Sequence, residues 1–155
     1  MEIQLWWTGK TQLKFISMGL EEYLQRLSHL CKFKVHEFKG TRGLQDPALI
    51  RKREEEEISA RLLSGDYLIL LDEKGTMRSS TELATHLDKL QQQTHGRIIF
   101  LIGGAYGFTD EFRSKARELI SFSSFTLSHQ LIRLFLAEQL YRAFTIIKKI
   151  PYHND

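Results

Sequence analysis

Short apolar runs alternate along the chain with longer segments in which apolar residues recur at helical spacing. Runs rich in β-branched and aromatic residues predict strands, which we expect at 3–8, 33–38, 67–71, 98–102 and 122–127. A period of 3.6 predicts helices between them, which we expect at about 10–30, 47–63, 79–93, 109–119 and 131–148. This alternation predicts an α/β fold in one domain, with a mostly parallel sheet of roughly five to six strands and helices on both faces.

Local signals mark the starts of several predicted helices. Asp46 followed by Pro47 is typical of an N-cap and a first helical turn. Ser79 and Glu82 have the spacing of a capping box. Thr109 precedes two acidic residues, which complement the positive end of a helix.

The last predicted helix, at 131–148, is apolar on almost all sides. A helix without a wide polar face is covered on more than one side. In a domain of this size the pattern indicates a subunit interface, and a symmetric homodimer is the expected assembly. A central core helix is the alternative that the pattern leaves open.

The strand at 98–102 ends in Gly103 and Gly104, with Gly107 three residues further on. Glycine lacks a Cβ, so a glycine pair at the carboxyl end of a parallel strand lets the backbone approach a ligand closely. On the glycines alone, an ordinary turn that needs positive φ is the preferred interpretation. The stretch is not a P-loop, because no Gly-Lys-Ser/Thr follows, and its spacing is not that of the dinucleotide-binding fingerprint.

Two other predicted strands also end in polar loops. Leu71 leads into Asp72 and Gly75, and the run at 122–127 leads into His129. Because the carboxyl ends of parallel strands meet at one edge of a sheet, the three loops are expected to converge. Their convergence indicates a ligand site more strongly than any one loop does.

Composition narrows the class of protein. The 155 residues include 42% hydrophobic residues, enough for a core without disulfides. Cys31 is the one cysteine, which excludes an intrachain disulfide and a cysteine metal cluster. No apolar run approaches the roughly 20 residues that span a bilayer, and there is no signal-peptide pattern. We therefore expect a cytoplasmic protein that does not bind a membrane.

The charges are mildly unbalanced and clearly segregated. There are 22 basic and 19 acidic residues. One basic group precedes the acidic run at 54–57 and consists of Lys39, Arg42, Arg51, Lys52 and Arg53. Such patches can hold phosphates, and a solvated helix face explains them equally well.

Several of these features together resemble one known family. The matching residues are Leu71-Asp72 with Gly75, Leu101 to Gly104 with Gly107, Ser123 to Leu127 with His129, Arg133, Glu138 to Ala143, and Tyr152-His153. In these motifs and in length the chain resembles the RlmH family, the SPOUT-class methyltransferases of large-subunit ribosomal RNA. The resemblance covers the whole chain and is most specific in its C-terminal third.

The resemblance implies a fold, a cofactor and a substrate. Similar proteins have a C-terminal trefoil knot, form homodimers and bind S-adenosylmethionine in the knot. They methylate N3 of a pseudouridine in the 23S ribosomal RNA hairpin that bridges the two ribosomal subunits, so the implied partner is the assembled ribosome. Carried over by position, the cofactor-binding residues are Leu71, Gly103, Gly104, Ser123, Ser124, Phe125, Thr126, Leu127 and Ser128. Methyl transfer from a sulfonium is an in-line displacement, so no metal is expected.

The same resemblance points to four catalytic candidates. An imide N–H must lose its proton, and His129 and His153 are candidate bases because histidine titrates near neutrality. Arg142 is the candidate stabiliser of the anion, and Tyr152 is placed to stack on the substrate base or to hydrogen-bond with it. Each also has a purely structural interpretation: His129 as a helix cap, Arg142 as the ion-pair partner of Glu138, and the tail residues as disordered. If the site forms across a dimer, the tail of one subunit is expected to complete the pocket of the other.

Three other functions stay open at this point. One is a SPOUT methyltransferase that acts on another RNA, such as a transfer RNA. Another is a ribosome-binding dimer that has lost the cofactor, against which Gly103-Gly104 and Tyr152-His153 speak. The third is a small-molecule nucleotide-binding domain, which the lack of a phosphate-loop motif disfavours.

Overall fold

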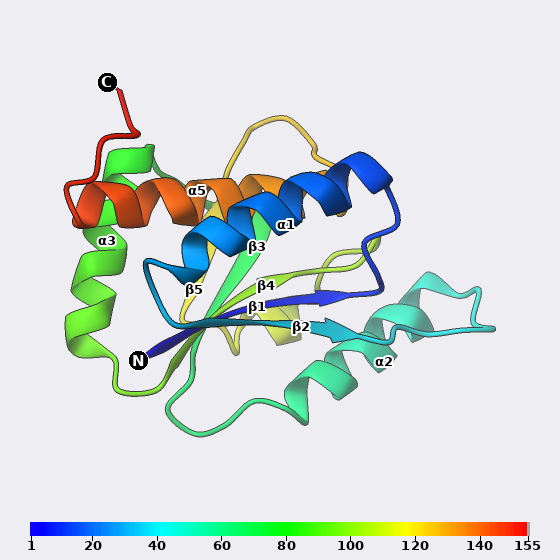
Figure 1. Ribbon diagram of the computed structural model, residues 1–155. Coiled ribbons are helices and arrows are strands. Elements are labelled where there is room, and N and C mark those ends of the chain that lie inside the picture. The colour runs from blue at the N-terminus through cyan, green and yellow to red at the C-terminus, as the bar shows by residue number, and fades with distance from the viewer. Residues whose placement is uncertain (155) are drawn as a thin grey trace.

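The computed structural model describes residues 1–154 as a five-stranded sheet with helices on both faces (Figure 1). The elements in chain order are β1 (Glu2–Thr8), α1 (Lys14–Ser28), β2 (Phe33–Phe38), α2 (Pro47–Ser59), β3 (Tyr67–Met77), α3 (Ser80–Gln93), β4 (Arg97–Ile102), α4 (Asp110–Arg113), β5 (Glu118–Ser121) and α5 (Leu131–Ile147). The predicted α/β class is confirmed. None of the described helices is long and apolar enough to cross a bilayer.

The strands lie in the order β2, β1, β4, β3, β5, and every neighbouring pair is parallel. Leu5 of β1 lies opposite Val35 of β2 on one side and Phe100 of β4 on the other. In a parallel sheet all carboxyl ends lie at one edge, and β1 and β2 show its direction by pointing to the right in Figure 1. The predicted parallel sheet is therefore confirmed, with five strands.

Alternate residues along the strands contribute to two separate cores, because successive side chains point to opposite faces. Trp7, 1% exposed, packs with the face covered by α1, α3 and α5. Trp6, fully buried, packs with the face covered by α2 and α4. Coverage of both faces explains why the central strands are continuous apolar runs.

The prediction of a strand at 122–127 was wrong, because β5 ends at Ser121. The Ser121 hydroxyl donates to the carbonyl of Ser123 at 3.0 Å, and the Ser123 hydroxyl accepts from the N–H of Phe125 at 2.9 Å. Such local bonds from serine compete with the hydrogen bonds of a sheet. Phe125 is 82% exposed, so its apolar side chain does not contribute to the core as the pattern suggested.

Two further boundaries differ from the prediction. The helix expected at 109–119 is the four-residue α4, and the residues that follow it enter β5. The third strand continues beyond Leu71, and after a register shift Thr76 lies opposite Ile120. The segment after Leu71, expected as a loop, is therefore part of a long, irregular strand.

Gly75 marks a close crossing of two backbones. A Cβ at Gly75 would lie 2.5 Å from the backbone nitrogen and carbonyl carbon of Ile120, so only glycine fits where β3 passes β5. A knotted chain needs close crossings of this kind. The trefoil knot itself stays a prediction.

Candidate active site

The three predicted cofactor loops follow three neighbouring strands. Leu71 lies in β3 opposite Ile102, the last residue of β4. Gly103 and Gly104 follow β4 directly, and the loop at 122–130 follows β5. Since β4, β3 and β5 are adjacent and parallel, the structure brings the three loops to the same edge of the sheet.

The glycine loop, residues 103–109, has no room for side chains at its start. A Cβ at Gly103 would lie 3.0 Å from the ring of Phe108, and one at Gly104 would lie 2.7 Å from the Glu54 carboxylate. Gly107 has a φ of 64°, and its N–H donates to the carbonyl of Gly104 at 3.1 Å. Gly107 therefore makes the turn, whereas Gly103 and Gly104 permit the close approach of other groups.

Two glutamates of α2 contact the glycine loop. The Glu55 carboxylate accepts hydrogen bonds from the N–H and the hydroxyl of Thr109 at 2.6 and 2.7 Å. The half-buried Glu54 carboxylate lies against Gly104 and has no hydrogen bond or ion pair within residues 1–154. Burial and the nearby charges of Glu55 and Glu57 raise the pKa of Glu54 above its ordinary value. Of the two carboxylates at the glycine loop, that of Glu55 is hydrogen-bonded and that of Glu54 is not hydrogen-bonded within residues 1–154.

His129 lies just before α5, next to the last cofactor loop. Its carbonyl accepts from Arg133 Nε at 3.1 Å. Burial and the charge of Arg133 lower the pKa of His129, so its imidazole is neutral at pH 7 and can accept a proton. The N-cap of α5 is Gln130, which has no side-chain cap hydrogen bond, and the Ser128 hydroxyl accepts from the N–H of Leu131 at 3.1 Å. The helix-cap interpretation of His129 was therefore wrong.

Arg133 joins the start of α5 to the end of β1. The side chain is 1% exposed and donates to the carbonyls of Thr8 and Gly9 at 2.8 and 3.0 Å and to the hydroxyl of Thr11 at 3.0 Å. Its guanidinium lies 5.2 Å from the centre of the Trp7 ring. No carboxylate pairs with it within residues 1–154, and burial lowers its pKa to about 10. The guanidinium is held by neutral oxygens and an aromatic face.

The other three catalytic candidates lie together at the far end of α5. Together with Glu138 they form the C-terminal cluster: Glu138, Arg142, Tyr152 and His153. Arg142 Nη2 donates to Glu138 Oε1 at 2.6 Å, Nη1 lies 3.2 Å from His153 Nδ1, and the guanidinium lies 4.7 Å from the Tyr152 ring centre. Tyr152 also donates to Glu138 at 3.1 Å. Arg142 therefore has more partners than the ion pair alone.

The tail is packed against α5, so its interpretation as a disordered segment was wrong. Lys149, with a φ of 56°, and the following Pro151 reverse the chain after the helix. The ring of Tyr152 then meets Tyr141 edge-on at 4.7 Å, and its hydroxyl lies 3.4 Å from that of Tyr23 in α1. Burial and hydrogen bonding raise the pKa of Tyr152, so its hydroxyl stays protonated at neutral pH.

The loops and the C-terminal cluster do not meet within one chain. His129 precedes the first turn of α5, whereas Arg142 lies near its last turn, roughly 16 Å further along the helix axis at 1.5 Å per residue. Figure 1 shows the loop before α5 and the C-terminus at opposite ends of that helix. The predicted site residues thus form two separate groups on the chain.

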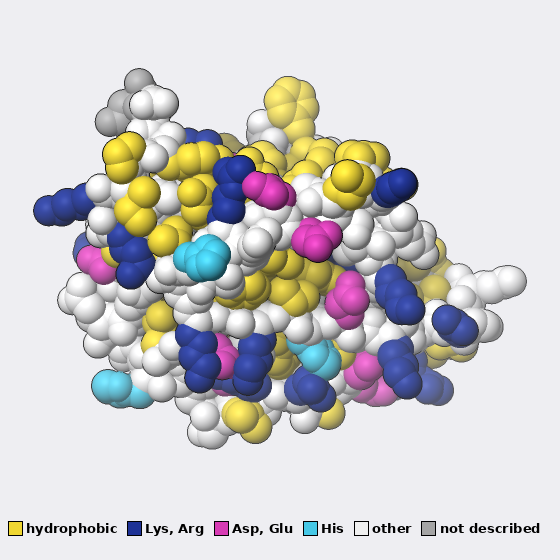
Figure 2. Space-filling model, in the orientation of Figure 1, with side chains coloured by type: hydrophobic (Ala, Val, Ile, Leu, Met, Phe, Trp, Pro, Cys, Tyr) yellow, Lys and Arg dark blue, Asp and Glu magenta, His cyan; other side chains and the backbone are white. Residues whose placement is uncertain are grey.

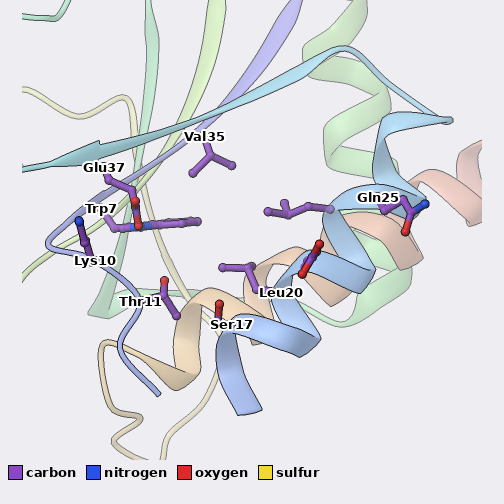
Figure 3. A pocket seen from close by; sticks show the side chains of 10 residues that line it. Trp7, Lys10, Thr11, Ser17, Leu20, Gln25, Val35 and Glu37 are labelled. Carbon is purple, nitrogen blue, oxygen red and sulfur yellow. The ribbon is translucent and has the colours of Figure 1, made fainter. Parts of the chain in front are cut away.

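A separate groove of about 720 Å³ lies between α1 and the edge strand β2 (Figure 3). It is lined by Trp7, Lys10, Thr11, Ser17, Leu20, Glu21, Leu24, Gln25, Val35 and Glu37. None of the predicted cofactor or catalytic residues is among them. Trp7 Nε1 donates to the carboxylate of Glu37, its neighbour on the adjacent strand, at 3.0 Å.

Sequence reasoning missed the residues that support the site from outside the motifs. Arg113, which belongs to no motif, donates from Nε to the Asp72 carboxylate at 2.8 Å and so connects α4 with β3. Glu54 and Glu55 reach the glycine loop from a helix that lies far away in the chain. The run of four glutamates is evident in the sequence, but which of them face the glycine loop depends on how α2 packs on the sheet.

Comparison with known proteins places this arrangement in a family. A family model described as "Predicted SPOUT methyltransferase" matches residues 1–153. The chain belongs to the SPOUT methyltransferase family. The enzyme class expected from the motifs is confirmed.

Curated relatives of this SPOUT methyltransferase match it over its whole length. One from Citrifermentans bemidjiense and one from Cytophaga hutchinsonii are both named "Ribosomal RNA large subunit methyltransferase H". The first is 44% identical and covers 100% of both chains, and the second is 44% identical and covers 99% of this chain and 100% of its own. The resemblance drawn from the motifs is thereby confirmed.

A solved structure supports the fold assignment. A tRNA (m1G37) methyltransferase from Aquifex aeolicus superposes with a TM-score of 0.51 at 13% identity. The alignment covers 92% of this SPOUT methyltransferase and 70% of that chain. At this identity the likeness concerns the fold alone.

Proposed function

We propose that this protein transfers a methyl group from S-adenosylmethionine to N3 of a pseudouridine in 23S ribosomal RNA. The observation that carries the proposal is the glycine pair at the end of β4, between the loops of β3 and β5 and at the edge where parallel α/β sheets bind ligands. The names of the full-length relatives support the ribosomal RNA as the substrate. The bridging hairpin is the part of that RNA implied by the motifs.

The residues at the three loops fit such a cofactor. Gly103 and Gly104 leave the backbone open, and the hydroxyl groups of Ser123, Ser124 and Thr126 offer neutral hydrogen bonds. Backbone and hydroxyl groups among apolar strand ends suit an adenosine, and Leu71, Phe125, Leu127 and Ser128 complete the proposed set. When bound, the cofactor supplies a methyl group on a sulfonium cation. The protein contributes alignment.

The proton on N3 of the substrate has to leave. His129 is suited to accept it, because its lowered pKa keeps the imidazole neutral at pH 7. His153 is the second candidate base, and its Nδ1 accepts from Arg142, because a guanidinium can only donate. The charge of Arg142 and the protonated hydroxyl of Tyr152 would stabilise the anion.

We propose that these groups meet across a homodimer, with the tail of one subunit completing the loops of the other. The separation of the two groups along α5 supports this arrangement. Exposed apolar side chains suited to an interface extend over α1, α5 and the last loop: Leu13, Phe15, Met18, Phe125, Leu131 and Phe135. Figure 2 shows hydrophobic side chains gathered along the upper edge of the molecule, over α1 and α5. A group of neighbouring exposed apolar side chains is typical of a protein–protein interface.

The proposed substrate is the assembled ribosome, which would place the enzyme in the cytoplasm. A net charge of +3 gives only a weak general attraction to free RNA. Recognition of the shape of an assembled ribosome would compensate for this. Protein-free hairpin RNA is therefore expected to be the poorer substrate.

Calorimetric titration of S-adenosylmethionine into the wild type and a Gly104→Val variant tests the cofactor site. The wild type is expected to bind and the variant to lose binding, because the valine side chain displaces Glu54 and fills the loop. Ala60→Val, at the exposed end of α2, is the control and should bind normally. A wild type that does not bind S-adenosylmethionine would contradict the proposal.

Mixing two inactive variants tests the composite site. Gly104→Val disables the cofactor loops of its own subunit, and Tyr152→Ala disables the tail of its own subunit. In a mixed dimer, the loops of the Tyr152→Ala subunit and the tail of the Gly104→Val subunit form one site in which both parts are intact. Recovery of methylation of ribosomes is expected on mixing. Mixed dimers that form and stay inactive would place loops and tail of the same subunit in each site.

A further inference from the structure

A second groove, of about 610 Å³, opens between α2 and the loop that follows β2. We call it the basic groove; it is lined by Gly40, Thr41, Arg42, Leu44, Arg53, Glu56 and Glu57. Gly40 and Gly43 have φ angles of 76° and 77°, which turn the loop around its cations. Figure 2 shows Lys and Arg side chains gathered at the right-hand end of the molecule, where β2 leads into this loop.

The cations around the basic groove are not neutralised within the protein. Elsewhere arginines pair with carboxylates, as Arg97 does with Asp66 and Arg113 with Asp72. Arg42 and Arg53 line the groove together with Glu56 and Glu57, and three more cations lie close to them in the chain. Within residues 1–154 no carboxylate lies within ion-pair distance of any of the five. These cations are Lys39, Arg42, Arg51, Lys52 and Arg53. Unpaired charges on one surface create a local positive potential.

The charge order along α2 is the reverse of what the helix itself favours. Its first turn contains no acidic residue and its last turn no basic one. Three cations lie in the first half, at 51–53, and the glutamates follow at 54–57. The helix dipole favours the opposite order, although its effect is largest in the first and last turns. The three cations lie in the middle of α2, and Arg53 among them lines the basic groove together with Arg42 of the loop.

The basic groove adjoins the proposed cofactor site through α2. Arg51 precedes Glu54 by three residues, which is roughly 5 Å along the helix axis. Glu54 and Glu55 turn toward the glycine loop, so the same helix contacts the cofactor loop and carries the groove cations. A polyanion in the groove would therefore contact the same helix that contacts the glycine loop.

We propose that the basic groove binds the phosphate backbone of the RNA next to the target nucleotide. This inference rests on the proposed RNA methyltransferase function and adds the surface that holds the substrate. Arg42 and Arg53 are suited to phosphates, since guanidinium groups bind them through paired hydrogen bonds. Phosphate contacts fix the position of RNA and carry no sequence information, so the groove sets the register and the site selects the base.

A double variant, Lys39→Gln with Arg42→Gln, tests the groove, and Lys32→Gln with Lys89→Gln is the control of equal charge. Both control positions are exposed. Lys32 precedes the amino end of β2 and Lys89 lies in α3, so neither is in the loop that follows β2 or in α2. Binding to ribosomes is measured at several salt concentrations, and S-adenosylmethionine binding by calorimetry. The groove variant should bind ribosomes on the order of ten-fold more weakly, with a salt slope smaller by about 1 to 2. The control should match the wild type, and both should bind the cofactor normally.

Failure of the groove and failure of the proposed function give different results. If the groove variant has the wild-type affinity and salt slope, the groove proposal is overturned even when methylation is normal. If the wild type binds ribosomes through the groove but never methylates them, the enzyme proposal fails alone. A photoreactive amino acid at the exposed Gln45 should crosslink to 23S RNA. Crosslinking to a ribosomal protein instead would identify an acidic protein as the occupant and overturn the RNA assignment.

Discussion

Glu54 shows how a single residue can weaken the fold where it supports the proposed site. Its carboxylate is half-buried against Gly104, near Glu55 and Glu57, without a cation in contact. Burial and like charges both disfavour the ionised form, so its pKa is raised. The folded protein therefore holds the Glu54 proton more tightly than the unfolded chain does.

We expect Glu54→Gln to raise the melting temperature at pH 7. Where the folded pKa exceeds the unfolded value, the folded state binds more protons between the two values, so stability falls as pH rises through that window. The gain in stability from the neutral glutamine should be complete at pH values above the raised pKa of Glu54 in the folded protein. It should be absent at pH values below the ordinary glutamate pKa, where the wild-type carboxyl is also neutral. Thermal unfolding at pH 7 and pH 4 measures it. Glu56→Gln, an exposed neighbour, changes the net charge equally and should not show the same gain at pH 7.

Arg142→Gln should reduce the methylation rate on the order of 10² to 10³-fold while leaving S-adenosylmethionine affinity unchanged, as loss of an anion-stabilising group does. Single-turnover assays and calorimetry separate the two effects. Arg26→Gln is the matched control, since Arg26 is another helical arginine paired with a glutamate four residues away. An equal rate loss in both variants would show that loss of a helical ion pair, and not of the charge in the C-terminal cluster, is responsible.

At the scale of elements, the strand and helix periods predicted the central part of the fold. The first four strands and α2, α3 and α5 follow from apolar runs and caps, and the Ser79–Glu82 capping box is present. The prediction failed at 122–127, because an apolar run does not show whether a partner strand is available. There the serine hydroxyls turn the chain and Phe125 stays exposed.

The candidate site could be predicted only where a motif carries it. Gly103, Gly104 and the tail residues belong to local motifs, so the sequence was sufficient to find them. The contacts of Glu54 with Gly104 and of Arg133 with the end of β1 join segments far apart in the chain. Local patterns contain no information about such contacts.

Gly75→Ala tests the crossing of β3 and β5. The added methyl would lie 2.5 Å from backbone atoms of Ile120, which cannot move aside as a side chain can, so we expect a loss of about 1–3 kcal/mol in the free energy of unfolding. Urea denaturation measures it. Gly19→Ala in α1 is the control, because its methyl meets only the flexible side chain of Leu134 at 3.1 Å. A tolerated Gly75→Ala would contradict the close crossing.

At the scale of the whole molecule, the proposed assembly explains why α5 is apolar on more than one side. One face of α5 is buried against α1 and α3, as a core helix would be. Leu131 and Phe135 nevertheless remain exposed, next to the apolar side chains of α1. The buried face of α5 is therefore that of a core helix, whereas the role of the exposed face as a subunit interface stays a prediction.

Met18→Glu combined with Phe135→Glu should give a monomer, because dimerisation would remove two negative charges from water and place them in an apolar interface. Sedimentation velocity measures the mass. The monomer is expected to stay folded and to lose methylation, since its loops would lack a tail from the partner. Leu63→Glu, an exposed apolar residue after α2, is the control. A monomer with normal activity would contradict the composite site.

The hydrogen bonds of Arg133 have a consequence for how the protein is made. They connect the last helix to Thr8 and Gly9, at the end of the first strand. During synthesis, the carbonyls of Thr8 and Gly9 and the ring of Trp7 have no contact with Arg133 until α5 has been translated. The end of β1 therefore gains these contacts only after α5 has been made, so a nascent chain that lacks α5 leaves the carbonyls of Thr8 and Gly9 without the Arg133 guanidinium.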